Sequence, residues 1–250
     1  MFRAGDGGEF AYFEQGSGGA RLLFVHGWQA DHTVWNDVVA ALGSGTRSVA
    51  VDLRGSGASS GARGPYNLER FAADLRELIE ALGIGPVVVV GHSMGATVAL
   101  RLAVDAPELV SGLILIAPVP AGGGGFSPRG ADFLRATAGD PAAARKWLSA
   151  MFAAEPDAGV LDRLCAAAGK TPRDAALESF ESWSNADFAE ATRAIAAPAI
   201  VVAPERDNPE MYQRKVTALL PNARFVELGD CGHYAIVERP GEIAKLIGEL

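Results

Sequence analysis

The sequence predicts an α/β protein with a mainly parallel sheet and helices on both of its faces. The first observation is that short apolar strands alternate with helical segments and are joined by short loops. The second is that some strands are apolar without interruption, as in the four valines of residues 87–90, which is typical of strands buried on both faces. The third is the length of 250 residues, 49% of them hydrophobic, which suffices for one sizeable core with an insertion.

The expected elements follow one another in a regular order. Strands are expected at residues 9–15, 21–25, 47–52, 87–90, 113–117, 198–203 and 223–228. Helices are expected at residues 34–42, 68–82 and 94–103, from Asn208-Pro209 toward 220, and from about 240 to the C-terminus. The helix at 68–82 has the clearest apolar periodicity, with Asn67 as its N-cap and Gly83 at its end. The glycine-rich residues 16–19 predict a turn between the first two strands.

The alternation stops after residue 117, where two prolines and the four glycines of residues 122–125 follow. Residues 126–187 show helical signals and no strand, with helix starts expected at Asp140-Pro141 and Thr171-Pro172. This pattern predicts a core at residues 1–120, a helical cap at 121–187 and the rest of the core at 188–250. The cap is expected over the carboxyl ends of the strands, where such sheets bind ligands. The alternative is a helical bundle packed against the edge of the sheet.

Ser93 is the candidate nucleophile. It lies in Gly91-His92-Ser93-Met94-Gly95, between a buried strand and an alanine-rich helix. The connection requires a sharp turn, and we expect a Cβ at either glycine to collide with the crossing backbone. The turn would present the hydroxyl at the carboxyl end of the strand, near the positive end of the helix dipole. The alternative is a chance match in a chain with 30 glycines.

A serine nucleophile needs a base, and the chain has four histidines. His233 follows the last strand on a glycine-containing loop, at the same edge of the sheet as Ser93, and is the predicted base. We expect His26 to shape its own loop and His92 to point into the core. His32 follows Trp28 on a loop and is a candidate substrate contact, with a solvated loop histidine as the alternative.

The carboxylate that orients the base is expected on the loop after the strand at 198–203. Asp207 is the predicted acid, Glu205 is the reserve, and capping of the next helix is the alternative role of Asp207. No carboxylate follows the strand at 113–117 closely. The oxyanion hole is expected from the backbone N–H groups of Trp28 and Met94.

Large apolar side chains in the insertion predict an apolar substrate site. Some of them must pack the cap helices together, and spacing alone leaves open which ones do so. The predicted substrate-binding residues are Trp28, His32, Trp147, Met151, Phe152 and Trp183. A cap of a few short helices indicates a modest pocket for short, medium or compact aromatic acyl groups.

Charge and cysteine usage limit the partners. A net charge of −8 and a pI near 5.1 argue against binding to nucleic acid or to an anionic membrane. Cys165 and Cys231 lie far apart and form no disulfide framework. Neither an apolar leader nor a run of membrane-spanning length is found, so a cytoplasmic location is expected. The expected partner is a small-molecule substrate, and the expected state is a monomer or a homodimer.

The chain resembles the α/β-hydrolase family over essentially its full length. The resemblance rests on His26-Gly27-Trp28, on Asp-Leu-Arg-Gly-Ser-Gly at residues 52–57, on residues 91–95, and on Cys231-Gly232-His233 followed by Glu238-Arg239-Pro240. It implies nucleophile, acid and base at Ser93, Asp207 and His233, and neither a metal nor an organic cofactor. It also implies an eight-stranded sheet with one antiparallel strand and a cap after the sixth strand. The first strand, on Phe2 and Arg3, is expected to be vestigial.

Two positions narrow the activity within that family. Ser93 excludes members with an aspartate nucleophile, such as epoxide hydrolases and dehalogenases. Gln29 stands where perhydrolase- or haloperoxidase-like relatives have proline, which argues against an activity of that kind. The predicted enzyme is a serine hydrolase of the carboxylesterase type, cleaving an ester, lactone or thioester of a small, largely apolar substrate through an acyl-enzyme. The alternatives are a carbon–carbon bond hydrolase of a diketone, a cofactor-free oxygenase and a non-catalytic small-molecule receptor.

Overall fold

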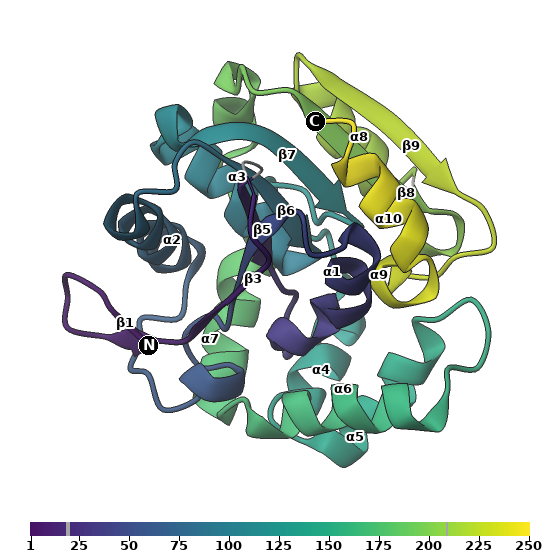
Figure 1. Ribbon diagram of the computed structural model, residues 1–250. Coiled ribbons are helices and arrows are strands. Elements are labelled where there is room, and N and C mark those ends of the chain that lie inside the picture. The colour runs from purple at the N-terminus through teal and green to yellow at the C-terminus, as the bar shows by residue number, and fades with distance from the viewer. Residues whose placement is uncertain (19–20, 209) are drawn as a thin grey trace.

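A computed structural model describes residues 1–18, 21–208 and 210–250. Over these residues it has a seven-stranded sheet in the order β3-β5-β4-β6-β7-β8-β9 (Figure 1). Six strands are parallel, and β3 at one edge runs antiparallel to β5. The strands are β3 (Tyr12–Gln15), β4 (Arg21–Val25), β5 (Arg47–Val51), β6 (Val87–His92), β7 (Val110–Ile116), β8 (Ala199–Pro204) and β9 (Ala223–Leu228).

The expectation of eight strands in one sheet is wrong for the described residues. β1 (Phe2–Arg3) pairs with β2 (Glu9–Phe10) in a separate two-stranded sheet, where the Phe2 ring packs edge-on against Phe10. The strand expected at 9–15 is broken at Ala11, whose backbone N–H donates to the Ser59 hydroxyl. The Ala11 carbonyl accepts from the Asp52 N–H at 3.0 Å, next to the first pair of β3 and β5, Tyr12 and Val51. The turn expected at residues 16–19 includes Gly19, which lies outside the described residues.

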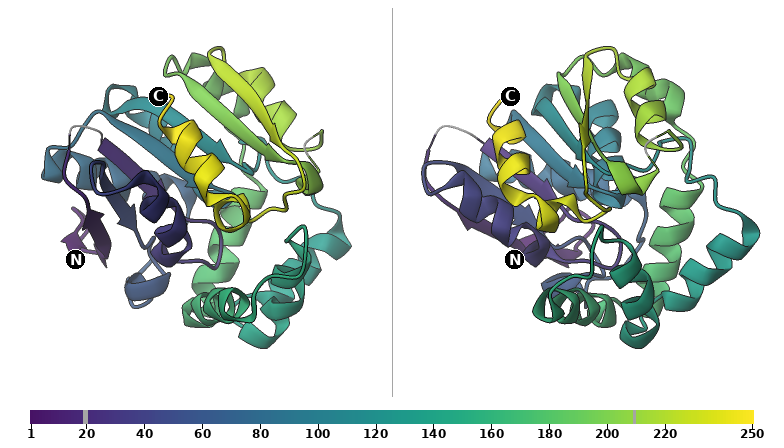
Figure 2. Two further views of the ribbon diagram at one scale, coloured as in Figure 1. Left: turned by 45° about the vertical axis from the view of Figure 1, so that its right-hand side comes forward. Right: turned by 90° about the vertical axis from the view of Figure 1, so that its right-hand side faces the viewer.

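Helices cover both faces of the sheet, as predicted (Figure 2). One face carries α2 (Leu68–Leu82), α3 (Met94–Asp105) and α8 (Gln213–Leu219), with α2 packed on α3. The other face carries α1 (Asn36–Leu42), α9 (Ala235–Glu238) and α10 (Pro240–Ile247), with α1 packed on α10. The core lies between these layers, where the inward residues of β4, β6 and β7 are fully buried. Short 3₁₀ turns lie at His32–Trp35, Gly57–Ser59, Pro107–Leu109, Ala189–Ala194 and Glu205–Asp207.

The ends of α2 and the start of α8 can be compared with the capping residues that the sequence predicts. Asn67 caps α2 by accepting a hydrogen bond from the Arg70 N–H, and Gly83 ends the helix with a φ of 59°, both as expected. The helix expected from residue 208 begins later, at Gln213, because the chain first forms a 3₁₀ turn and an αL residue at Asn208, where φ is 56°. Pro209, the other half of the expected helix start, lies outside the described residues.

Four helices occupy the chain between β7 and β8, and Figure 1 shows them gathered below the sheet. We call them the cap helices: α4 (Pro128–Thr137), α5 (Pro141–Ala150), α6 (Ala158–Lys170) and α7 (Arg173–Ser184). Asp140 caps α5 as expected, accepting hydrogen bonds from the N–H groups of Ala142 and Ala143. Thr171 does not cap α7: the N-cap is Pro172, and the Thr171 hydroxyl donates back to the Ala167 carbonyl.

Among the described residues, no helix is both long enough and apolar enough to cross a membrane. Cys165 and Cys231 are buried and unpaired.

Candidate active site

Ser93 lies at the sharp turn between β6 and α3, with φ at 54° and ψ at −122°. Positive φ is unfavourable for a residue with a side chain and persists only where the surroundings enforce it. Here a Cβ on Gly91 would lie 2.6 Å from the Ala96 Cα, and one on Gly95 would lie 2.2 Å from the Val25 carbonyl oxygen. Both positions therefore require glycine, as the sequence predicts, and the turn holds Ser93 at the carboxyl end of the central strand.

His233 and Asp207 lie together at this edge. The His233 Nδ1 is 3.0 Å from the Asp207 Oδ1, and both side chains are mostly buried. The ring N–H does not point at this oxygen, so the pair is in contact without an aligned hydrogen bond. The other oxygen of Asp207 accepts a hydrogen bond from the Gln213 Nε2 at 2.9 Å. Gln213 therefore fixes the orientation of the carboxylate that faces the histidine.

Glu205, the reserve acid, has a different partner. Its Oε2 accepts a hydrogen bond from the Asp230 backbone N–H at 2.8 Å, which stabilises the loop before His233. Asp207 does not take its alternative role either, because the N-cap of α8 is Tyr212. Of the two carboxylates, it is Asp207 that lies beside His233.

His26 and His92 are both buried. The His26 Nδ1–H donates to the Gly27 carbonyl at 2.8 Å, while its Nε2 accepts from the Leu53 N–H at 3.0 Å. The His92 Nε2 donates to the His233 carbonyl at 2.9 Å. Burial lowers the pKa of both rings, that of His92 to about 3, with the neighbouring His233 as a further cause. Both rings are therefore neutral in the folded protein at neutral pH.

These two histidines predict that the protein becomes less stable in mild acid. Below the ordinary histidine pKa of 6.5, these two histidines are protonated in the unfolded chain but remain neutral in the folded protein. The free energy of unfolding therefore falls as the pH drops. Each ring contributes a slope of up to about 1.4 kcal/mol per pH unit. Urea denaturation at pH 7, 6 and 5 measures this slope. His92→Gln, which keeps an N–H donor, should have a shallower slope than wild type, and equal slopes would contradict the assignment.

The turn at Gly27 and Trp28 lies against Ser93. A Cβ on Gly27 would lie 3.2 Å from the Ser93 Cβ. In the described part of the chain, neither the Trp28 nor the Met94 backbone N–H donates to a backbone carbonyl in the turns, loops and caps. The Met94 N–H, in the first turn of α3, also has no partner inside the helix. Both predicted oxyanion donors are thus free to bind a ligand.

Ser93, Asp207 and His233 share one cavity of about 260 Å³. The cap helices and the segment before them supply an apolar wall opposite these three residues, and no Lys or Arg belongs to the described lining. Four of the predicted substrate contacts, Trp28, Trp147, Met151 and Trp183, line it. The rest of the lining is Gly27, His92, Ala117, Pro118, Val119, Phe126, Leu134, Tyr212, Gln213 and Tyr234. No three His, Cys, Asp or Glu side chains gather as a metal site anywhere in the described chain.

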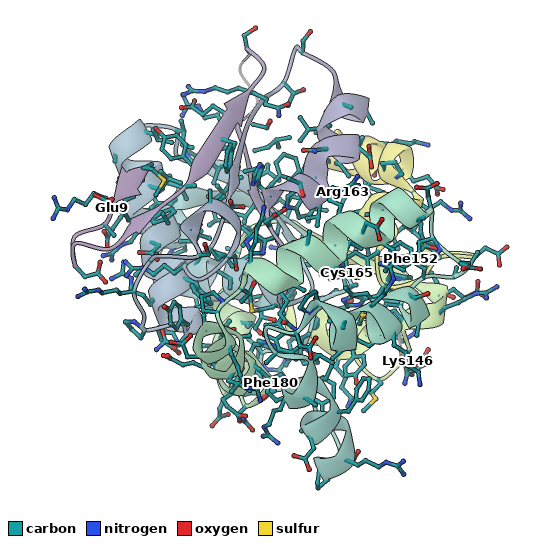
Figure 3. All side chains as sticks on the ribbon, turned by 90° about the horizontal axis from the view of Figure 1, so that it is seen from below. Glu9, Lys146, Phe152, Arg163, Cys165 and Phe180 are labelled. Carbon is teal, nitrogen blue, oxygen red and sulfur yellow. The ribbon has the colours of Figure 1, made fainter. Side chains whose placement is uncertain are left out.

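Two predicted substrate contacts lie outside this lining. The His32 Nδ1 is 2.8 Å from a buried oxygen of Asp52, and its ring stacks on Phe13, so it belongs to the loop around β5. Phe152 stacks on the cavity residue Tyr234, with ring centroids 5.1 Å apart. Figure 3 shows Phe152 among the side chains beside the cap helices. Both residues instead contact a neighbour that is distant in the sequence.

The family model described as "Alpha/beta hydrolase family" matches residues 22–246, which is most of the chain. The chain belongs to the α/β-hydrolase family. One curated relative is BpoC from Mycobacterium tuberculosis, whose name describes a non-heme bromoperoxidase. It is 31% identical to this chain, and the match covers 92% of each chain. Lipase LipV of the same organism is 30% identical over 92% of this chain and 93% of its own.

Solved structures share the α/β-hydrolase fold of this chain. An esterase from Exiguobacterium antarcticum superposes with a TM-score of 0.90, covering 99% of this chain and 97% of its own at 20% identity. The enol-lactonase from Burkholderia xenovorans superposes with a TM-score of 0.87, covering 98% and 96% at 24% identity. At these identities the likeness establishes the fold alone.

Sequence reasoning missed several residues of this α/β-hydrolase cavity. The sequence predicts Gln213 inside a helix, and nothing in its local pattern indicates the hydrogen bond to Asp207. Pro118 and Val119 could have been found, because they directly follow β7 at the edge where Ser93 lies. Phe126 and Leu134 carry no such signal, since their direction depends on how α4 packs.

Proposed function

We propose that this α/β-hydrolase is a serine hydrolase that cleaves carboxylic esters of small, largely apolar acids through an acyl-enzyme. The observation that supports it best is the shared cavity: Ser93 on its strained turn and the His233–Asp207 pair, 3.0 Å apart, line the same apolar space. A nucleophile, a base and an orienting carboxylate at one site are what acyl transfer requires.

Each group has a role in that reaction. The Ser93 hydroxyl attacks the ester carbonyl while His233 takes its proton, and Asp207 stabilises the resulting imidazolium. The N–H groups of Trp28 and Met94 bind the oxyanion. His233 then protonates the leaving alcohol and later activates water, which hydrolyses the acyl-enzyme and regenerates Ser93.

The cavity favours a neutral and compact acyl group. Its volume of about 260 Å³ lies just below the range of about 300 to 1,000 Å³ that is typical of ligand sites. A carboxylate on the acyl chain would lose its hydration without meeting a cation, because no Lys or Arg belongs to the described lining. The indole rings of Trp28, Trp147 and Trp183 provide apolar contact area instead.

The relative named for a bromoperoxidase raises peroxide as an alternative acceptor for the same acyl-enzyme. Gln29 occupies the position after Trp28, with φ at 54°, and its amide binds the cap rather than the cavity. The Gln29 Oε1 accepts from the Gly139 N–H at 2.8 Å, and its Nε2 contacts the Thr137 hydroxyl. We therefore propose water, not peroxide, as the acceptor, so that the ester is converted to a carboxylic acid and not to a peroxyacid.

Acyl length tests the substrate class. With p-nitrophenyl esters, kcat/KM should rise by up to about fourfold per added methylene, because each buried CH₂ contributes up to about 0.8 kcal/mol. The rise should end at medium length, when the cavity is full. The measurement is kcat/KM for acyl chains of two to twelve carbons, with cyclic lactones as a second series.

Several outcomes would contradict this proposal. A flat response from two to eight carbons would show that the acyl chain does not enter the cavity. Activity that peaks on long-chain triglycerides would show that the cavity admits far more than its volume indicates. Oxygen uptake during turnover would indicate the oxygenase alternative, and a Ser93 that resists fluorophosphonates would indicate a receptor.

A further inference from the structure

The loop that carries His233 is attached to the turn between α5 and α6, which we call the cap turn, residues 151–153. The His233 backbone N–H donates to the Met151 carbonyl at 2.7 Å. A Cβ on Gly232 would lie 2.3 Å from that oxygen and 2.7 Å from the Ala153 nitrogen. The two backbones therefore meet with no side chain between them.

One carboxylate joins both sides of this contact. The Glu238 Oε2 accepts from the Gly232 N–H at 2.8 Å, and its Oε1 accepts from the Ala153 N–H at 2.9 Å. Hydrogen bonds to an ionised carboxylate are stronger than those between neutral groups. Glu238 thus holds the residue before His233 and the cap turn at a fixed separation.

The loop that carries the acid is tied to the same point. The Arg206 Nη1 donates to the Ala153 carbonyl at 2.9 Å, and the Arg206 backbone N–H donates to the Cys231 carbonyl at 3.1 Å. Arg206 directly precedes Asp207 in the chain. The cap turn therefore contacts the loops of both the base and the acid.

We propose that Glu238 is a positioning residue for His233, and that the cap turn supports the catalytic base instead of moving as a lid. This inference rests on the serine hydrolase proposed above, because it assigns a role through His233. A displacement of about 1 Å at a catalytic group can cost about a hundredfold in rate. The outer side of Glu238 borders a surface hollow lined by Arg206, Asp230 and Arg239, from which water can replace a lost bond.

The test is Glu238→Gln, which keeps the size but turns an NH₂ group toward one of the two N–H donors. With p-nitrophenyl acetate, whose acyl group is too short to fill the cavity, we expect kcat to fall at least tenfold and KM to stay within twofold. The rate of labelling by a fluorophosphonate should fall by the same factor as kcat. Glu242→Gln is the matched control, because Glu242 is exposed and its partner is Arg239 on the same segment.

Stability is measured alongside, since a merely structural role would lower the free energy of unfolding without changing kcat in the folded fraction. Should Glu238→Gln not fold, Glu238→Asp keeps the charge, reaches at most one donor, and should lose less activity. A folded Glu238→Gln that labels and turns over within twofold of wild type would overturn the inference, as would a rise in KM alone. A wild-type protein that neither labels nor hydrolyses esters would overturn the proposed function as well.

Discussion

Ser93→Ala is expected to lower kcat for p-nitrophenyl esters by about 10⁴- to 10⁶-fold and to abolish covalent labelling by a fluorophosphonate. The range is that found when a triad nucleophile is removed from other hydrolases. The reason lies in the geometry of the turn, where Gly91 and Gly95 leave no room for a Cβ and hold Ser93 at a φ of 54°. Steady-state kinetics on purified protein and mass spectrometry after labelling measure the two effects.

The control for this substitution is Ser111→Ala, which alters an exposed serine on β7. It should leave kcat and labelling at the wild-type values. The Ser93→Ala protein should unfold at a similar urea concentration to wild type, because the hydroxyl faces the cavity. A kcat of Ser93→Ala within tenfold of the wild-type value would contradict the assignment of Ser93 as the nucleophile.

Local chain geometry explains why the sharp turn at Ser93 could be predicted. Strand, turn and helix follow one another within residues 87–105. Gly91 and Gly95 are needed because backbone atoms of the neighbouring helix and strand lie too close for a Cβ. The position of His233 and Asp207 follows in the same way, because parallel strands end at one edge of the sheet. Each of these features could be predicted from a local sequence pattern together with the order of the strands.

Contacts between distant segments explain what could not be predicted. The Ala11 N–H donates to the hydroxyl of Ser59, 48 positions away, at the point where the strand expected at 9–15 is interrupted. His32 turns toward Asp52, and Phe152 turns toward Tyr234. The bond between Glu238 and Ala153 joins residues 85 positions apart. None of these pairs leaves a periodic or compositional trace, because each depends on how separate elements pack.

Asp207→Asn is expected to lower kcat by about 10³- to 10⁴-fold with little change in KM. The hydrogen bond from the Gln213 Nε2 requires an oxygen on its side of residue 207, so the asparagine would turn its NH₂ group toward the His233 Nδ1. An N–H facing Nδ1 favours the tautomer whose proton is on Nε2, and that ring cannot accept the serine proton. Kinetics with one short ester, measured on folded protein, give the loss.

Glu205→Gln is the matched control, a carboxylate two residues away on the same loop. Its Oε2 accepts from the Asp230 N–H at 2.8 Å, and glutamine keeps an oxygen that can accept the same bond. We therefore expect kcat within about threefold of wild type, near the size of effect that one weakened surface hydrogen bond has. The reverse ranking of the two variants would move the acid to Glu205. Equal and small losses would mean that His233 needs no carboxylate here, and that the 3.0 Å contact with Asp207 serves only to pack the loop.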